Sequence, residues 1–391
     1  MEVGEAGRGN GDAVVAGVRG PAAVVAAHGM GQQVPFETLD TLLAGFGEAA
    51  RGPIARTVIV GGERLHRLEA VLTLPDGSSR EVHFYEAYWA PITEGQVGIR
   101  DVIGFLWRSG LSGIRHGLKP FRRSIFNAVV EFPVPARTAL QFAATLAAFT
   151  AAALLYAVLV RELAMRASLG SPLLWEAPAW LLALLGALWV RGVLVQYVGD
   201  VAVYVQPQVL DRFAEMRQRI KDTVQKTTRA VYCEPYEDVI LVGHSLGSVV
   251  LYDVLNSLLV DQALGIAGAP EVAGRTRLLL TFGSPLDKTA FIFGTVGRRS
   301  LARDALAASL QPLVTNREVR PPWINLYSPW DLISGPLDYY DLPDRSNPHP
   351  AANVRDPGAT TPLLAHVEYW RGSLLFATIL DHLGGRPASA R

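Results

Sequence analysis

The sequence predicts an α/β protein. Short apolar runs end at glycine-containing turns, as Pro21–Ala27 does before His28-Gly29 and Val239–Val242 does before Gly243. Longer segments follow in which apolar residues recur at helical spacing. The runs are typical of buried strands and the longer segments of amphipathic helices. We therefore expect strands and helices to alternate along much of the chain.

The composition sets limits on the class of protein. With 391 residues, the chain can form one large domain with an insertion, or two domains. Its formal net charge is zero, which gives no general reason to expect nucleic acid as a partner. The single cysteine, Cys233, rules out an internal disulfide. Residues 1–20 are rich in glycine, alanine and charge without a signal-peptide pattern, and we expect a flexible tail there.

The first third of the chain predicts a strand, a helix and a set of extended runs. The strand Pro21–Ala27 leads into a glycine loop, and residues 36–50 have helical spacing. Extended runs follow at 55–60, 67–74 and 81–89. Pro75-Asp76-Gly77, between the last two runs, predicts a hairpin turn.

Residues 100–137 change in character. Seven basic side chains face two acidic ones and are interleaved with apolar residues. This pattern predicts an amphipathic segment on an anionic membrane surface. A solvated surface helix is the alternative.

Two apolar stretches come next and predict a helical hairpin through a membrane, with helices at about 138–160 and 175–197. The first contains 23 residues without a charge, enough to cross a hydrocarbon core of about 30 Å. The second is interrupted by Arg191. Few positive charges lie between the helices, which places the flanking regions in the cytoplasm, at the inner or plasma membrane. A soluble, buried hairpin that acts as a hydrophobic lid or dimer interface is the alternative.

The second half of the chain returns to alternating elements. We expect a helix over 207–231 with a charged, solvated face, and a second helix over about 246–260. Strands are predicted at 239–242, 277–282 and 323–328, and residues 338–362 read as loop. A last helix follows His366.

The segment Gly243-His244-Ser245-Leu246-Gly247 lies between a predicted strand and a predicted helix, and this context predicts a nucleophile elbow. Glycines two before and two after the serine leave room for a very sharp turn. The turn exposes the Ser245 hydroxyl and directs the N–H of Leu246 toward an oxyanion.

Nucleophilic acyl transfer also needs an imidazole to accept and return the proton, and a carboxylate to orient it. Asp331 and His366 both follow Ser245, each where a strand or loop ends. Asp287 is the rival acid, and His349 and His382 are the rival histidines. His244 adjoins the nucleophile and is expected to shape the turn.

Together these segments resemble the α/β-hydrolase superfamily, specifically its lipase-like and esterase-like members. The resemblance covers His28-Gly29-Met30-Gly31, the elbow, Thr281–Pro285, Tyr327–Asp331 and His366 with Tyr369-Trp370. It implies a mostly parallel sheet with helices on both faces and a catalytic triad of Ser245, His366 and Asp331. It also implies oxyanion donors at Met30 and Leu246 and no cofactor. His28 is then a residue that shapes the loop, and no His/Asp/Glu cluster has metal-ligand spacing.

These inferences give the expected organisation. Residues 1–20 and 384–391 are tails, 21–96 and 201–383 form the two parts of the hydrolase domain, and 97–200 is an insertion that carries the hairpin. The expected function is a membrane-anchored serine hydrolase that cleaves esters or thioesters of apolar acyl chains, with a lipid-like substrate. A non-catalytic membrane scaffold and an acyltransferase with the same triad are the alternatives.

Overall fold

The structure, a computed structural model, describes a defined part of the chain. This part comprises residues 20–29, 33–94, 96, 121–125, 128–132, 144, 147–148, 150–152, 154–162, 165, 181, 184–188, 211–289, 310–331, 333–340, 349–362 and 364–384. Most of the two predicted tails and of the insertion lies outside it.

An eight-stranded sheet forms the centre of the fold. Its strands are β1 (Ala22–Ala27), β2 (Ala50–Val60), β3 (Glu63–Thr73), β4 (Ser79–Glu86), β7 (Asp238–His244), β8 (Thr276–Phe282), β9 (Trp323–Tyr327) and β10 (Ala352–Arg355). Their order across the sheet is β10-β9-β8-β7-β1-β4-β3-β2. Neighbouring strands pair in parallel from β10 to β4, whereas the pairs β4–β3 and β3–β2 are antiparallel. The predicted α/β class is confirmed, with a mostly parallel sheet.

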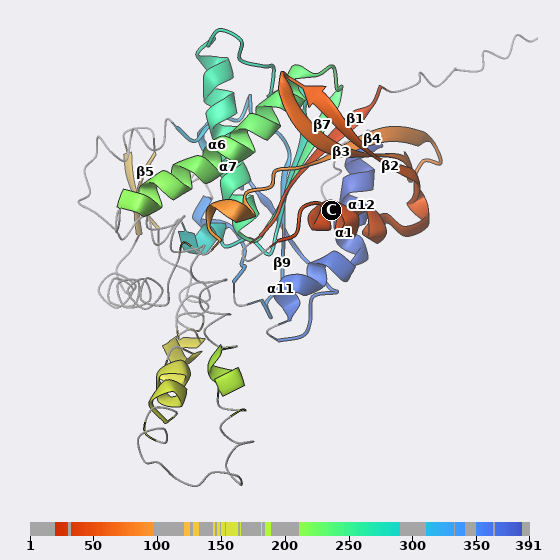
Figure 1. Cartoon of the computed structure of the whole chain (residues 1–391). Coiled ribbons are helices and arrows are strands. Elements are labelled where there is room, and N and C mark those ends of the chain that lie inside the picture. The colour runs from red at the N-terminus through yellow and green to blue at the C-terminus, as the bar shows by residue number, and fades with distance from the viewer. Residues whose placement is uncertain are drawn as a thin grey trace, which may run out of the picture.

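Helices cover both faces of this sheet (Figure 1). Helices α6 (Asp211–Cys233) and α7 (Leu246–Ala263) lie on one face, and α1 (Glu37–Phe46) and α12 (Ser373–Leu383) lie on the other. Side chains of β1 alternate between the two cores: Ala23 and Val25 pack toward α6 and α7, whereas Val24 packs toward α1 and α12. A strand buried on both faces has an almost continuous apolar sequence, which explains the run Pro21–Ala27.

The hairpin predicted at Pro75-Asp76-Gly77 joins β3 to β4. Gly77 has φ 81°, a conformation that glycine adopts without steric cost. The N–H of Ser78 donates to Asp76 Oδ1 at 2.9 Å, which closes the turn. Beyond the turn, Tyr85 and Trp89 are fully buried, as expected for the packed end of a strand.

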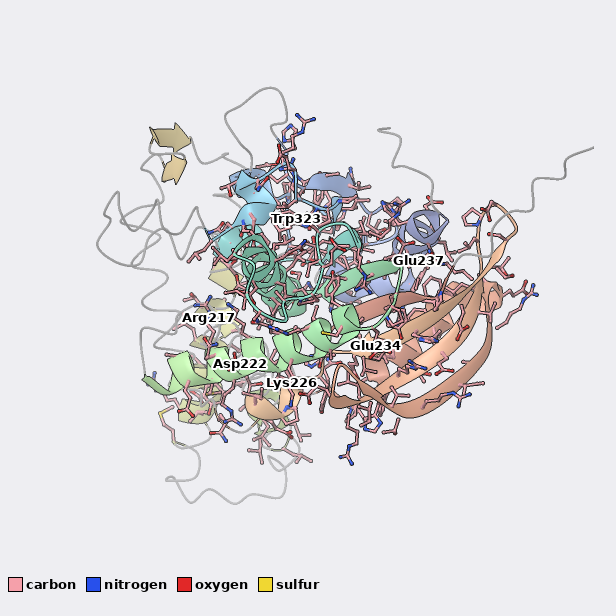
Figure 2. All side chains as sticks on the ribbon, turned by 90° about the horizontal axis from the view of Figure 1, so that it is seen from above. Arg217, Asp222, Lys226, Glu234, Glu237 and Trp323 are labelled. Carbon is pink, nitrogen blue, oxygen red and sulfur yellow. The ribbon has the colours of Figure 1, made fainter. Side chains whose placement is uncertain are left out.

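Helix α6 explains the run of charges between 211 and 233. Figure 2 shows Arg217, Asp222 and Lys226 along this helix, at the surface of the molecule. Phe213, Ile220 and Val224 of the same helix are buried against the sheet. The charged residues therefore form its solvated face, as the sequence predicts.

The described part of residues 100–137 contains two strands, which contradicts the alternative prediction of a surface helix. β5 (Phe121–Ile125) and β6 (Ala128–Phe132) pair as a separate antiparallel hairpin, so a surface helix is wrong for these residues. Their aromatic and β-branched side chains favour extended structure.

The expected pair of long apolar helices is not found among the described residues. Helical stretches do occur there, at 154–162 and 184–188, and they lie together at one end of the molecule (Figure 1). Tyr156 of the first stretch packs against the core between the sheet and helices α6 and α7. The first stretch continues through Arg161 and Glu162. Arginine and glutamate have high helix propensity, so the end of the apolar run does not mark the end of the helix. Within the part of the chain that the structure describes, no helix has both the length and the apolar character to cross a membrane.

The predicted loop over 338–362 is wrong at Ala352–Arg355, which form β10. This edge strand has four residues and pairs in parallel with β9. Asn353 Oδ1 accepts a hydrogen bond from Asn325 Nδ2 at 3.0 Å, which fixes β10 to β9 through polar groups. So short a strand, with polar contacts, leaves no apolar periodicity in the sequence.

Candidate active site

Ser245 occupies a sharp turn between β7 and α7, at the carboxyl end of the parallel strands. Its backbone has φ 50° and ψ −127°, a conformation that residues other than glycine rarely adopt. Such strain costs about 1–3 kcal/mol and is found mainly at functional sites. The Ser245 N–H donates to the carbonyl of Phe282 at 3.0 Å, which ties the turn to β8.

Three glycines make this turn possible because other backbone lies very close to them. A Cβ on Gly243 would lie 2.6 Å from the Cα of Ser248, and a Cβ on Gly247 would collide with the carbonyl oxygens of Ala27 and His28. A Cβ on Gly29 would lie 2.8 Å from that of Ser245. The glycine pattern of the elbow therefore reflects direct steric exclusion.

His366 lies within reach of the serine hydroxyl. It belongs to α11 (Ala365–Glu368), a short helix that follows the loop after β10. The distance from His366 Nε2 to Ser245 Oγ is 2.9 Å. Both side chains are largely buried, at 1% exposure for Ser245 and 8% for His366. The two groups can therefore exchange a proton directly.

Asp331, in the loop after β9, holds the other side of the same imidazole. Its Oδ2 lies 3.0 Å from His366 Nδ1. Because the carboxylate can only accept, Nδ1 carries the proton and Nε2 is left free to accept the serine proton. Burial acts to raise the pKa of Asp331, but the neighbouring His366 and hydrogen bonds from His366, Ser334 and the Ile333 N–H outweigh it, and the pKa lies well below its usual value.

Tyr369 and Ser334 complete the surroundings of Asp331. Tyr369 was named only as part of the resemblance behind His366, and neither residue was predicted to contact the carboxylate. The Tyr369 hydroxyl donates to Asp331 Oδ2 at 3.1 Å and lies 2.9 Å from Ser334 Oγ. Burial and the nearby Asp331 raise the pKa of Tyr369, so its hydroxyl stays protonated and can donate. The sequence gives only a weak signal for these contacts. Ser334 follows Asp331 by three residues, and Tyr369 follows His366 by three residues.

His28 shapes the glycine loop opposite the elbow. Its Nε2 accepts a hydrogen bond from the Trp89 N–H at 3.1 Å, so Nδ1 is protonated and donates to the carbonyl of Gly29 at 2.9 Å. Its ring also stacks on Trp89 with 4.7 Å between centroids. Burial lowers the pKa of His28 to about 4, which keeps it neutral. This arrangement matches a role in shaping the loop and leaves no basic nitrogen for Ser245.

One of the two expected oxyanion donors can be placed. Leu246 is the first residue of α7, and an N–H at this position has no partner within its own helix. The positive end of the helix dipole adds to its attraction for an anion. Met30 lies outside the described residues.

The rival residues lie in other environments. Asp287 is fully buried, and its Oδ1 lies 3.6 Å from Lys288 Nζ. His382 Nδ1 is bonded to the carbonyl of Thr378 within α12, and His349 is exposed. The structure thus brings Asp331 and His366 to Ser245, and it gives Asp287 and His382 other partners.

A group of possible metal ligands lies on the outer strands, away from the elbow. One ligand atom each from Glu69, Glu81 and His83 lies within 4.8 Å of the others. The two oxygens of Glu69, however, already accept hydrogen bonds from Arg67 and Arg56. These guanidinium groups neutralise Glu69 and repel a cation, so the arrangement favours an ion-pair network over a metal site.

Comparisons with known proteins identify no family for this chain. Neither the protein-family models, nor the curated proteins, nor the solved structures contain a match. The function of this chain is therefore inferred from the geometry of the site.

Proposed function

We propose that this chain is a serine hydrolase of the α/β-hydrolase type, which cleaves carboxylic esters or thioesters of apolar acyl chains. One observation supports it above the others: Ser245, His366 and Asp331 form a continuous chain of hydrogen bonds of 2.9 and 3.0 Å at a strained elbow. In a serine triad the nucleophile, the imidazole and the carboxylate are hydrogen-bonded in this order.

In the proposed first step, Ser245 Oγ attacks the acyl carbon while its proton passes to His366 Nε2. Asp331 stabilises the imidazolium that forms, and the N–H of Leu246 stabilises the oxyanion. His366 then returns the proton to the leaving alcohol or thiol, the bond from the acyl carbon to the leaving group breaks, and Ser245 carries the acyl group as an ester.

In the second step, His366 accepts a proton from water, and the hydroxide attacks the acyl carbon. The tetrahedral intermediate collapses as His366 protonates Ser245 Oγ, which releases the carboxylic acid and restores the enzyme. No cofactor takes part in either step.

A non-catalytic scaffold of the same fold predicts that the triad is distorted, with His366 out of reach of Ser245. The observed contact of 2.9 Å, with Nδ1 of the same ring bonded to Asp331, favours the hydrolase. An unused serine also has no evident reason to keep a backbone conformation that costs stability.

A fluorophosphonate probe tests the nucleophile. It should label the detergent-solubilised wild type, and Ser245→Ala should abolish labelling. The matched control is Ser257→Ala. Ser257 lies on α7, its hydroxyl donates to the Asp253 carbonyl, and the variant should label like wild type. Equal labelling of wild type and Ser245→Ala would exclude Ser245 as the nucleophile. A panel of esters and thioesters of increasing chain length then identifies the substrate class.

The insertion supports a second part of the proposal, that the enzyme is anchored at a membrane. Exposed apolar side chains are concentrated on its described helical stretches: Leu154, Leu155, Val158, Val160, Leu181, Leu184, Leu185 and Leu188. A Cβ on Gly186 would lie 3.7 Å from Leu159 Cδ1, so the two stretches pack against each other and direct their leucines outward. Such a surface is suited to lipid tails.

Flotation with anionic lipid vesicles tests this anchoring. Wild type should float with the vesicles, and the double variant Leu155→Glu/Leu185→Glu should float less. Leu264→Glu replaces an even more exposed leucine just after α7 and should not change flotation. Failure of the wild type to float, or equal flotation of all three proteins, would contradict a lipid-binding role for these stretches.

A further inference from the structure

His244, the residue before the nucleophile, makes a hydrogen bond to the segment that carries the catalytic histidine. Its Nε2 lies 3.0 Å from the backbone carbonyl oxygen of His366. A carbonyl oxygen only accepts, so Nε2 of His244 carries the proton and donates it. The bond joins the end of β7 to α11, which lies 122 residues away in the chain.

The His244 ring is held on several sides. Its centroid lies 5.0 Å from that of His366 and 5.4 Å from that of Trp370. Cβ atoms on Gly29 and Gly283 would lie 3.0 and 3.2 Å from its two ring nitrogens. The glycine loop, the turn after β8 and the histidine segment therefore all meet at this ring.

From this geometry we propose that His244 is a positioning residue, which fixes the main chain of His366 so that one imidazole reaches both Ser245 and Asp331. The inference rests on the proposed hydrolase activity and extends it to a residue that does not touch the reacting atoms.

The segment needs such support because α11 has only four residues. A helix of this length is marginal by itself, and its orientation depends on contacts with the rest of the protein. His366 must satisfy two distances at once, 2.9 Å to Ser245 and 3.0 Å to Asp331. A shift of about 1 Å in such a group can cost about 100-fold in rate.

The chemistry of His244 suits this role. Burial and the neighbouring His366 lower the pKa of His244 to about 3, so it stays neutral while His366 takes up the serine proton. It therefore remains a donor of fixed geometry throughout the reaction and adds no charge beside the imidazolium.

Two substitutions separate the hydrogen bond from the shape of the ring. His244→Phe keeps an aromatic ring and removes the donor, whereas His244→Gln places an amide N–H at a similar reach. We expect His244→Phe to lower kcat by about 10- to 100-fold with little change in KM. We expect His244→Gln to restore most of the rate. A merely structural role would affect both variants through their stability and would not distinguish them in kcat.

A second measurement does not depend on turnover. In protein with 15N-labelled histidine, the Nδ1–H of His366, bonded to Asp331, should give a downfield proton resonance. The resonance should persist in His244→Gln and broaden or vanish in His244→Phe. The resonance can be observed even if the wild type cleaves no substrate. Failure of the proposed hydrolase activity can therefore be told apart from failure of the proposed role of His244.

The inference is overturned if His244→Phe folds and keeps both its kcat and the His366 resonance. It is also overturned if His244→Gln loses as much rate as His244→Phe while both remain folded, because the donor would then not be the feature that matters. Preserved kcat and resonance in His244→Gln, with both lost in His244→Phe, support it.

Discussion

The hydroxyl of Tyr369 donates to Asp331 Oδ2, the same carboxylate oxygen that faces the imidazole of His366. The other oxygen, Oδ1, accepts from the Ile333 N–H at 2.8 Å. The carboxylate is therefore fixed in position and direction by groups that do not touch the serine. Orientation of the imidazole by a fixed carboxylate is the main contribution that the acid of a triad makes.

Tyr369→Phe should lower kcat by about 10-fold, because it removes a hydrogen bond to a charged group in a buried site. KM should change little, since the hydroxyl bonds Asp331 and Ser334 and not the Ser245 hydroxyl that would meet the substrate. Tyr340→Phe is the control: its hydroxyl bonds the carbonyl of Leu286 at 3.2 Å, and it is also buried. Steady-state kinetics of both variants checks this, and equal kcat values for them would contradict it.

The elbow could be predicted because its geometry restricts the residues that fit. Gly243 and Gly247 lie against backbone atoms, so both positions require glycine. The resulting Gly-x-Ser-x-Gly pattern can be recognised in the sequence alone. The main strands could be predicted for a similar reason, since burial on both faces gives β1, β7 and β8 an uninterrupted apolar run.

The supporting contacts of the site could not be predicted, because they join residues that are far apart in the sequence. Tyr369 meets Asp331, and His244 meets the His366 carbonyl, only after distant segments have packed together. The sequence could offer Asp287 and Asp331 as acids, but the order of the strands decides which one faces His366. β10 was missed because it has four residues and is held by polar contacts, so no apolar period can be recognised. In β5 and β6, charged residues alternate with apolar ones within a longer segment of amphipathic character, which hid the strands.

Asp331→Asn should lower kcat by about 1,000- to 10,000-fold, because an amide in place of the carboxylate favours the wrong tautomer of His366. Asp287→Asn is the matched control and should keep kcat within a few-fold of wild type, because Asp287 faces Lys288. A larger loss of kcat in Asp287→Asn than in Asp331→Asn would reverse the assignment of the acid.

Stability should fall as the pH drops through the acid range, and Asp331 should contribute to that fall. Its pKa in the folded protein lies below the value of about 3.9 expected in the unfolded chain. The unfolded state therefore takes up a proton first, so the stabilisation from this group is present above about pH 5 and is lost as the pH falls below about 4. Urea unfolding at several pH values should show a shallower acid slope for Asp331→Asn than for wild type. Identical slopes would contradict the prediction.

Arg80 joins distant parts of the chain and should be a major determinant of stability. Its side chain is 1% exposed, pairs with Asp238 at 2.6 Å and donates to the carbonyls of Gly20 and Leu383. Arg80→Met should lower the free energy of unfolding by about 2–4 kcal/mol, because it leaves the half-buried Asp238 and two main-chain carbonyls without their donor. Lys226→Met breaks the exposed pair with Glu63 and should cost less than about 1 kcal/mol. Urea denaturation of both variants measures the difference, and similar losses would contradict it.

Gly247→Ala should abolish activity and destabilise the fold, because the added methyl group collides with the carbonyl oxygens of Ala27 and His28. These atoms belong to the end of β1 and the start of the glycine loop, so the chain can relieve the collision only by moving the loop or the elbow. Gly186→Ala is the control, since its added methyl would make only an ordinary contact of 3.7 Å, and alanine favours a helix. Probe labelling of Ser245 and thermal unfolding should both be impaired in Gly247→Ala and preserved in Gly186→Ala. Normal labelling of Gly247→Ala would mean that the close approach of the glycine loop to the elbow is not needed for a reactive serine.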